Sequence, residues 1–214
     1  MKRILIACEE SDEVRGRFEK LGFDAWSCDL QENRNPNAKH YKGDIFDIIN
    51  DGWDAMIAFP PCTHLAVSGA AWFDQKRKDG RQQQGIDFFM AMINAPIKHI
   101  AVENPVGIMS KIYRKPDQVI QPYYFGDEAQ KTTCLWLKNL PAIYHNSKPN
   151  LFDSVVTHVG KGDFIIHKSG KRKPKWFADS FNLPKEERAK IRSKTFPGIA
   201  EAMANQWGEY LLSK

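Results

Sequence analysis

Short apolar runs recur along the first half of the chain and predict the strands of a buried sheet. Each run ends where polar residues or prolines begin, and together they cover residues 3–8, 23–28, 53–59 and 97–102. A fifth run, 132–137, follows a stretch in which the pattern weakens. Helical segments separate the first runs, and this alternation is typical of a parallel sheet covered on both faces. We therefore expect an α/β fold with a doubly wound, mostly parallel sheet.

Apolar residues with helical spacing locate the helices. The first helix is expected to begin with Ser11 as its N-cap and to end at Gly22, with Val14, Phe18 and Leu21 on its buried face. The remaining expectations are helices over about 85–94 and 197–212, a polar stretch at 75–84, a loop at 31–42 and a short helix or strand at 44–49. Three tryptophans are expected to pack rather than to stack on bases: Trp72, Trp136 and Trp207.

The composition fits one globular domain, expected over residues 1–214. The chain has a formal net charge of +5, 42% hydrophobic residues and a mean hydropathy of −0.51. No run approaches the roughly 18 apolar residues of a membrane span, and the apolar run near the N-terminus is too short for a signal peptide. We therefore expect a cytoplasmic protein with no membrane partner. Cysteines at Cys8, Cys28, Cys62 and Cys134 form no CxxC pair, which indicates reduced thiols and no metal site.

Polar side chains gather at the predicted strand ends, where α/β sheets bind their ligands. They are Glu9, Glu10, Ser11, Asp29, Asp44 and the two motifs Phe59-Pro60-Pro61-Cys62 and Glu103-Asn104-Pro105. One strand-helix-strand unit separates the motifs, so both can lie at the same edge of the sheet. A cysteine held after two prolines beside a carboxylic acid can act as a nucleophile next to an acid. His64, two residues after Cys62, could orient this loop, contact a phosphate or face solvent.

These two motifs resemble the hallmark of the DNA (cytosine-5) methyltransferases, in which Pro-Cys and Glu-Asn follow two strands. Asp29, Gly43-Asp44-Ile45 and the segment 193–200 are similar to further motifs of that family, in the same order. The resemblance covers residues 1 to about 140 and 192–212. It is a resemblance to short phage-type and prophage-type members that lack a full target-recognition domain. It implies a class I methyltransferase (Rossmann-like) fold, S-adenosylmethionine as cofactor and DNA as partner.

The resemblance also implies a role for each matched residue. Cys62, with a lowered pKa, would add to C6 of cytosine, while Glu103, with a raised pKa, donates a hydrogen bond to N3; Asn104 belongs to the same motif. A base within a duplex would have to be flipped out. At the cofactor it places Asp29 on the ribose hydroxyls, Asp44 on the adenine amino group, Thr195 at the methionine end, and Glu9, Ser11 and Pro60 around the pocket. Asp29 and Asp44 could instead simply begin loops, and Thr195 could cap the last helix.

On the substrate side the chain departs from the family pattern. The first loop, 7–11, holds no glycine, although the family uses glycine there for close backbone approach. The family's arginine-containing strand appears as Gln130-Lys131-Thr132-Thr133-Cys134, so Lys131 is left to steady the cytosine beside Pro61 and His64. A reduced basic insertion at about 140–190 replaces the usual recognition domain. Its segment 160–175, with Lys171, Arg172 and Lys173, is either a flexible solvated loop or a minimal contact to phosphates.

Three functions follow as alternatives. The first is methylation of cytosine C5 in DNA through a covalent Cys62 adduct. The second is the same chemistry on a free pyrimidine nucleotide, or with a group other than methyl. The third is an inactive methyltransferase-like protein that binds nucleic acid or a partner, which the missing glycines favour and the pair Cys62 and Glu103 opposes. An amino-group methyltransferase fits poorly, because Phe59 stands where those enzymes carry Asp or Asn.

Overall fold

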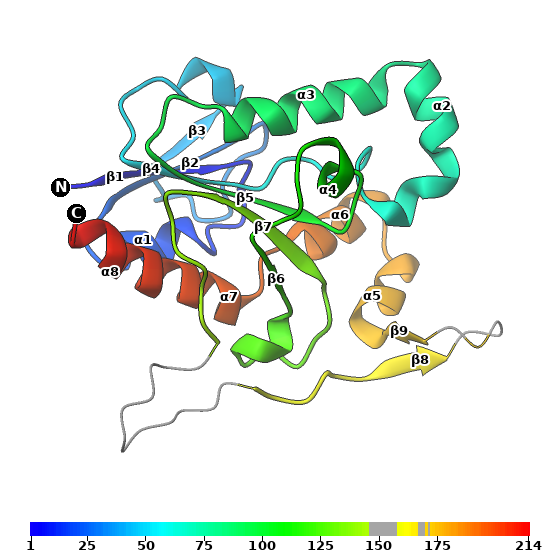
Figure 1. The fold of residues 1–214 in the computed structure, drawn as a ribbon. Helices are drawn as coiled ribbons and strands as arrows, with labels where there is room; N and C mark the ends of the chain where they lie inside the picture. Colours follow the sequence, from blue (N-terminus) through cyan, green and yellow to red (C-terminus); the bar gives the residue numbers. More distant parts are fainter. Residues whose placement is uncertain (146–157, 167–169, 171) are drawn as a thin grey trace.

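A computed structural model describes residues 1–145, 158–166, 170 and 172–214 (Figure 1). Its main sheet has the strand order β3-β2-β1-β4-β5-β7-β6. In chain order these strands are β1 (Arg3–Ala7), β2 (Asp24–Asp29), β3 (His40–Lys42), β4 (Ala55–Ala58), β5 (His99–Pro105), β6 (Gln118–Ile120) and β7 (Thr133–Lys138). Strands β1 to β5 pair in parallel, whereas β7 is antiparallel to both β5 and β6. This topology confirms the expected α/β fold with a doubly wound, mostly parallel sheet.

Helices cover both faces of this sheet, with α3 on one face and α1, α7 and α8 on the other (Figure 1). The described helices are α1 (Arg15–Lys20), α2 (Phe73–Lys78), α3 (Arg81–Ile93), α4 (Met109–Ile112), α5 (Lys175–Asp179), α6 (Lys185–Ser193), α7 (Pro197–Ala202) and α8 (Gly208–Leu212). A five-residue π-helical segment, Met203–Trp207, joins α7 to α8. The predicted closing helix over 197–212 is therefore one nearly continuous helical segment.

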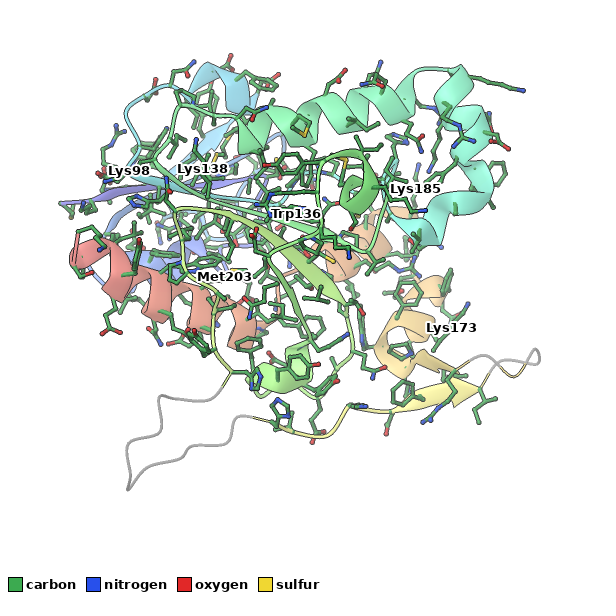
Figure 2. The ribbon with its side chains drawn as sticks, viewed as in Figure 1. Lys98, Trp136, Lys138, Lys173, Lys185 and Met203 are labelled. Carbon is green, nitrogen blue, oxygen red and sulfur yellow. The ribbon has the colours of Figure 1, made fainter. Side chains whose placement is uncertain are left out.

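Two hydrophobic cores explain why the helices divide in this way. Successive residues of a strand point to opposite faces, so Ile4 and Ile6 pack with α1 and α7, whereas Leu5 and Ala7 pack with α3. Trp207 is completely buried in the first core and Trp136 in the second, as predicted. Figure 2 shows Trp136 in the middle of the molecule, where its ring packs edge-on against that of Phe89 at 5.1 Å between centroids. Trp72 contradicts the prediction, because it is 64% exposed.

The first helix is shorter than the sequence predicts, and its cap differs. It begins at Arg15, and the carboxylate of Glu9 accepts hydrogen bonds from the backbone N–H groups of Val14 and Arg15 at 2.8 and 3.0 Å. The prediction of Ser11 as N-cap was therefore wrong, because a buried carboxylate nearer the strand takes that place. Leu21 follows the end of the helix and is 44% exposed, so it does not extend the buried face.

Three segments have more regular structure than the pattern predicts. The predicted loop 31–42 ends in the edge strand β3. Residues 45–47, within the segment expected as a short helix or strand, form a 3-10 helix, and Asp44 caps it by accepting a hydrogen bond from the N–H of Phe46 at 3.1 Å. The polar stretch 75–84 contains most of α2 and the start of α3, which begins at Arg81. The basic segment 160–175 contains the hairpin strands β8 (Phe164–Ile166) and β9 (Arg172–Pro174).

The carboxyl ends of the parallel strands point toward the side of the molecule that carries α2, α6 and the β8–β9 hairpin (Figure 1). In Figure 2, Lys173 and Lys185 lie on this side, whereas Lys98 and Lys138 lie at the opposite end. The segments that the sequence could not assign to the sheet therefore stand over the edge where α/β folds bind ligands. None of the helices in the described ranges has the length and apolar character to cross a membrane.

Candidate active site at the carboxyl edge of the sheet

The two motifs predicted to meet at one sheet edge do meet, because β4 and β5 are direct neighbours. The side-chain amide of Asn104 donates a hydrogen bond to the backbone carbonyl oxygen of Pro60 at 2.9 Å. Asn104 is only 1% exposed, and it lies within β5 rather than after it. The side-chain oxygen (Oδ1) of Asn104 has no hydrogen-bond partner among the described residues. Asn104 thus ties the end of one strand to the Pro-Pro-Cys loop of the next.

Buried side chains hold the turn that carries Cys62. The carbonyl oxygen of Cys62 accepts bonds from the N–H groups of Leu65 and Ala66 at 3.0 and 2.9 Å. The next carbonyl, of Thr63, accepts a bond of 2.6 Å from the ammonium of Lys76. The carbonyls of His64 and Leu65 accept bonds from Gln82 and from the backbone of Ile108 at 3.3 and 3.0 Å. Every backbone carbonyl from 62 to 65 is therefore paired, which fixes the turn.

Two residues that hold this turn were not predicted from the sequence: Lys76 on α2 and Gln82 at the start of α3. They are 7% and 5% exposed, although polar residues of these types are mostly found at the surface. No sequence signal distinguishes them, since each stands in a run of polar residues. They are buried because α2 and α3 fold back over the turn, where Lys76 and Gln82 bond the carbonyls of Thr63 and His64.

Glu103 and Cys62 lie near each other, and their charges are coupled. Burial raises the pKa of Glu103 above its usual value, against the lowering effects of Lys131 and of a hydrogen bond with Thr133. The raised pKa of this carboxyl agrees with the prediction. Burial also raises the pKa of the Cys62 thiol, and the negative charge of Glu103 adds to this effect, whereas Lys131 and Lys76 oppose it. The predicted lowering of the pKa of Cys62 is therefore contradicted, and burial, the first cause, acts whether or not Glu103 is ionised.

Two neighbouring cavities lie at this edge. A small one of about 10 Å³, enough for about one water molecule, is lined by Phe59, Glu103, Lys131, Thr133, Thr195, Phe196, Ile199 and Met203. A groove of about 400 Å³ is lined by Arg34, Asp127, Trp176, Lys190, Ile191, Lys194, Thr195, Phe196 and Pro197. Thr195 and Phe196 line both. The segment before α7 therefore separates the carboxyl of Glu103 from a groove large enough for a nucleoside-sized ligand.

Thr195 does not cap the last helix, because Phe196 occupies the N-cap position without a side-chain bond. The N–H of Gly198 instead donates to a carboxylate oxygen of Asp127 at 2.8 Å. A Cβ atom at Gly198 would stand 1.9 Å from the carbonyl oxygen of Phe125, so only glycine fits there. The side chain of Thr195 is consequently available to the two cavities.

The first loop adopts glycine-like backbone conformations without glycine. Cys8 and Asp12 have φ angles of +60° and +65°, in the left-handed region that side chains other than Gly, Asn and Asp rarely adopt. Strained residues of this kind concentrate at functional sites, although strain alone does not identify a ligand. The side chain of Glu10, which follows Cys8 by two residues, is 9% exposed and forms an ion pair of 2.6 Å with Arg34. Its second oxygen has no hydrogen-bond partner within the described ranges.

The remaining residues expected at the cofactor differ in how free their side chains are. The Glu9 carboxylate is occupied by α1 and by the hydroxyl of Ser11, at 3.2 Å. Asp29 is half-buried at the end of β2, and one of its oxygens accepts a bond from the N–H of Gln31 at 2.9 Å. Burial raises the pKa of Asp29, and the nearby charge of Glu10 acts in the same direction. Asp44 is exposed beside it on the neighbouring turn.

The residues expected at the substrate fall into two groups. Pro61, His64 and Lys131 lie in or near the Cys62 turn; Pro61 is exposed, and Lys131 also bonds the carbonyl of Lys194 at 3.2 Å. Burial lowers the pKa of His64, and the charges of Lys76 and Arg81 lower it further, so His64 is neutral near pH 7. A neutral imidazole contributes no charge to a phosphate contact.

The second group lies on the β8–β9 hairpin. Arg172 packs over the ring of Phe164 at 4.5 Å, and Lys173 over that of Phe181 at 5.4 Å. Lys171 lies outside the described residues. All four cysteines are free thiols, and no group of three or more His, Cys, Asp or Glu side chains in the described part could hold a metal ion.

Comparisons with known proteins find one distant structural likeness. No family model matches the chain, and no curated protein matches it either. Among solved structures, one that resembles the chain is described as a candidate DNA modification methyltransferase encoded within a prophage (E. coli). The two share 18% of residues, with a TM-score of 0.45, and the match covers 64% of this chain but only 46% of that protein. A likeness of this size does not extend to function, so the function is argued from the residues of the site.

Proposed function

We propose that this chain transfers a methyl group from S-adenosylmethionine to C5 of a cytosine in DNA, with Cys62 as nucleophile and Glu103 as acid. The observation that carries the proposal is that the turn of Cys62 and the half-buried carboxyl of Glu103, whose pKa is raised, lie at the ends of neighbouring strands. A stable structure does not need a thiol, a carboxyl with a raised pKa and a partly buried lysine at one sheet edge. Covalent catalysis on a pyrimidine ring does, because each group has a separate task.

The reaction needs covalent help because C5 of cytosine is a weak nucleophile. The sulfur of Cys62 forms a bond to C6 while the protonated carboxyl of Glu103 donates a hydrogen bond to N3, and the electron pair of the C5=C6 bond becomes available at C5. When bound, S-adenosylmethionine supplies an electrophilic methyl group. After methyl transfer, loss of the C5 proton re-forms the double bond as the C6–S bond breaks, and Cys62 leaves as a thiolate. Lys131, which lines the same small cavity as Glu103, would stabilise the negative charge that develops on the cytosine ring.

The donor and acceptor groups at the ends of β1 and β2 suit the cofactor. The carboxylate of Asp29, which accepts a bond from the N–H of Gln31, can also accept one from a ribose hydroxyl, and Asp44 can accept one from an adenine amino group. The unpartnered buried oxygen of Glu10 supports a ligand donor in the same region. Thr195, beside the groove that Arg34 and Lys194 line, would contact the methionine end. Glu9 and Ser11 act on the cofactor only through the backbone that they hold, and Pro60 through its place next to Cys62.

DNA is the proposed substrate because cationic side chains stand over the same edge. Arg172 is exposed and Lys173 half-buried on the hairpin, each resting on an aromatic ring that orients it. Phosphate contacts of this kind position a nucleic acid without reading its sequence. Trp72, exposed on the segment that follows the Cys62 turn, adds an aromatic surface on which a base could stack.

The test is transfer of radiolabelled methyl from S-adenosylmethionine to duplex DNA, single-stranded DNA, RNA and dCMP, with Cys62→Ser and Glu103→Gln alongside the native chain. We expect label on DNA that Cys62→Ser abolishes and Glu103→Gln strongly reduces, with thermal unfolding close to native in both variants. Label on dCMP alone would contradict DNA as substrate and favour a nucleotide enzyme. Absence of label on every substrate, from folded protein, would refute methyl transfer and favour the binding protein or another transferred group.

A further inference from the structure

Lys76 is a buried cation next to the turn of Cys62. It lies in α2, is 7% exposed, and its ammonium donates to the carbonyl oxygen of Thr63 at 2.6 Å. It also lies over the ring of Phe73, at 5.9 Å from the centroid. Among the described residues, no carboxylate forms an ion pair with it. Burial of an ammonium without a counter-charge is costly, so a positive charge at this place calls for an explanation.

A neutral side chain would satisfy the carbonyl of Thr63 equally well. The same turn shows this twice, since Asn104 bonds the carbonyl of Pro60 and Gln82 bonds that of His64 through neutral amides. The chain also keeps space for the ammonium, because a Cβ atom at Gly69 would stand 3.1 Å from its nitrogen. The hydrogen bond alone therefore does not account for a lysine here.

The charge of Lys76 acts on Cys62. The ionisable groups that influence the thiol are Glu103 on β5, Lys131 before β7 and Lys76 on α2. Glu103 opposes a negative charge on the sulfur, whereas both lysines favour it. His64, in the same turn, is held neutral by burial, Lys76 and Arg81, so it adds no charge of its own.

We propose that Lys76 is a positioning residue for the Cys62 thiolate: its ammonium fixes the turn that carries the cysteine and adds to that turn a positive charge that no carboxylate among the described residues pairs. Its use in catalysis rests on the proposed function, in which Cys62 attacks as a thiolate. The charge and its effect on the sulfur belong to the protein itself and need neither cofactor nor substrate.

The test is the pH dependence of alkylation of Cys62 by iodoacetamide, followed by mass spectrometry of the peptide that contains Cys62. Only the thiolate reacts, so the midpoint of the rate profile reports the ionisation of this thiol. In Lys76→Met we expect the midpoint to move up by about 0.5–1 pH unit, which lowers the rate near neutral pH about three- to tenfold. Lys76→Arg should retain the native midpoint. Lys78→Met, which removes an exposed charge from the same helix, should leave it unchanged.

A purely structural role would give another result. If Lys76 only held the turn, Lys76→Met would change the rate by one factor at every pH without a shift of the midpoint, and this outcome would overturn the proposal. Should Lys76→Met not fold, Lys76→Gln keeps a neutral donor and makes the same comparison. Methyl transfer with an unshifted midpoint refutes only the role of Lys76, whereas a shifted midpoint without methyl transfer refutes only the proposed function.

Discussion

Asn104→Asp is the most direct test of the bond that ties β5 to the Pro-Pro-Cys loop. The substitution keeps the size of the side chain and replaces the amide that donates to the carbonyl of Pro60 at 2.9 Å. An ionised carboxylate has no proton to donate, and it would face a carbonyl oxygen in a position that is 1% exposed. When protonated, the same carboxyl could donate to Pro60 as the native amide does.

The magnitude follows from these contacts. The loss of one net hydrogen bond costs about 1 kcal/mol, and an unsatisfied buried carbonyl costs about 1–3 kcal/mol more, so we expect a loss of about 2–4 kcal/mol at pH 8. Burial and the nearby Glu103 raise the pKa of the new carboxyl in the folded state above its unfolded value near 4. Below about pH 4 the carboxyl is protonated in both states, and the loss is smallest. It grows by about 1.4 kcal/mol per unit as the pH rises toward the folded pKa.

The measurement is urea unfolding followed by the fluorescence of the buried tryptophans, at pH 4.5 and pH 8, for the native chain and the variant. Asn50→Asp, at an exposed position, adds the same charge without disturbing a buried bond and serves as control. The reasoning is refuted if Asn104→Asp costs less than about 1 kcal/mol at pH 8, or if its cost is the same at both pH values.

Two further predictions concern Glu9 and the hairpin. The pKa of Glu9 is raised to about 7 because burial outweighs its hydrogen bonds to α1. Its folded pKa therefore exceeds its unfolded one, and the native chain loses stability as the pH rises from about 4.5 to 7. Urea unfolding of Glu9→Gln should show no such loss from this group, and a pH profile of stability identical to that of the native chain would contradict the prediction. Replacement of Arg172 and Lys173 by alanine should reduce the slope of log K for DNA against log salt by about 1–2, whereas Lys20→Ala, on the exposed end of α1, should leave the slope unchanged.

The sheet could be predicted because its information is local. The inner parallel strands are largely buried on both faces and therefore read as apolar runs, so the sequence predicts the runs that end at Cys8, Cys28, Phe59 and Val102. The edge strand β3 has no such run, and its polar sequence predicts a loop instead. Only two of its three residues are even half-buried, so its place depends on pairing with β2 rather than on its own sequence.

The site could be predicted only in part, because some of its residues are placed by contacts that are distant in the sequence. Cys62, Glu103 and Asn104 stand next to strands and have recognisable neighbours, so strand-end reasoning brings them together. Lys76 and Gln82 approach the same turn from helices whose sequence looks like a solvated polar stretch. Their burial is decided by how α2 and α3 fold back, and tertiary contacts of this kind leave no periodic signal in the chain.

Two effects raise the pKa of the Cys62 thiol, and only the second of them is reversible: burial comes first, and the negative charge of Glu103 adds to it. Glu103 opposes the thiolate only while it is ionised, and the state required at N3 of a cytosine is the protonated one. When Glu103 takes up its proton, the repulsion ends while the attraction of Lys131 and Lys76 remains, so the sulfur ionises more readily. The two groups therefore favour each other's active forms: a neutral acid promotes the thiolate, and a thiolate holds the proton on the acid. While Glu103 is ionised and Cys62 is a neutral thiol, neither group is in its reactive form. A ligand that binds the protonated carboxyl of Glu103 would therefore also promote ionisation of the Cys62 thiol.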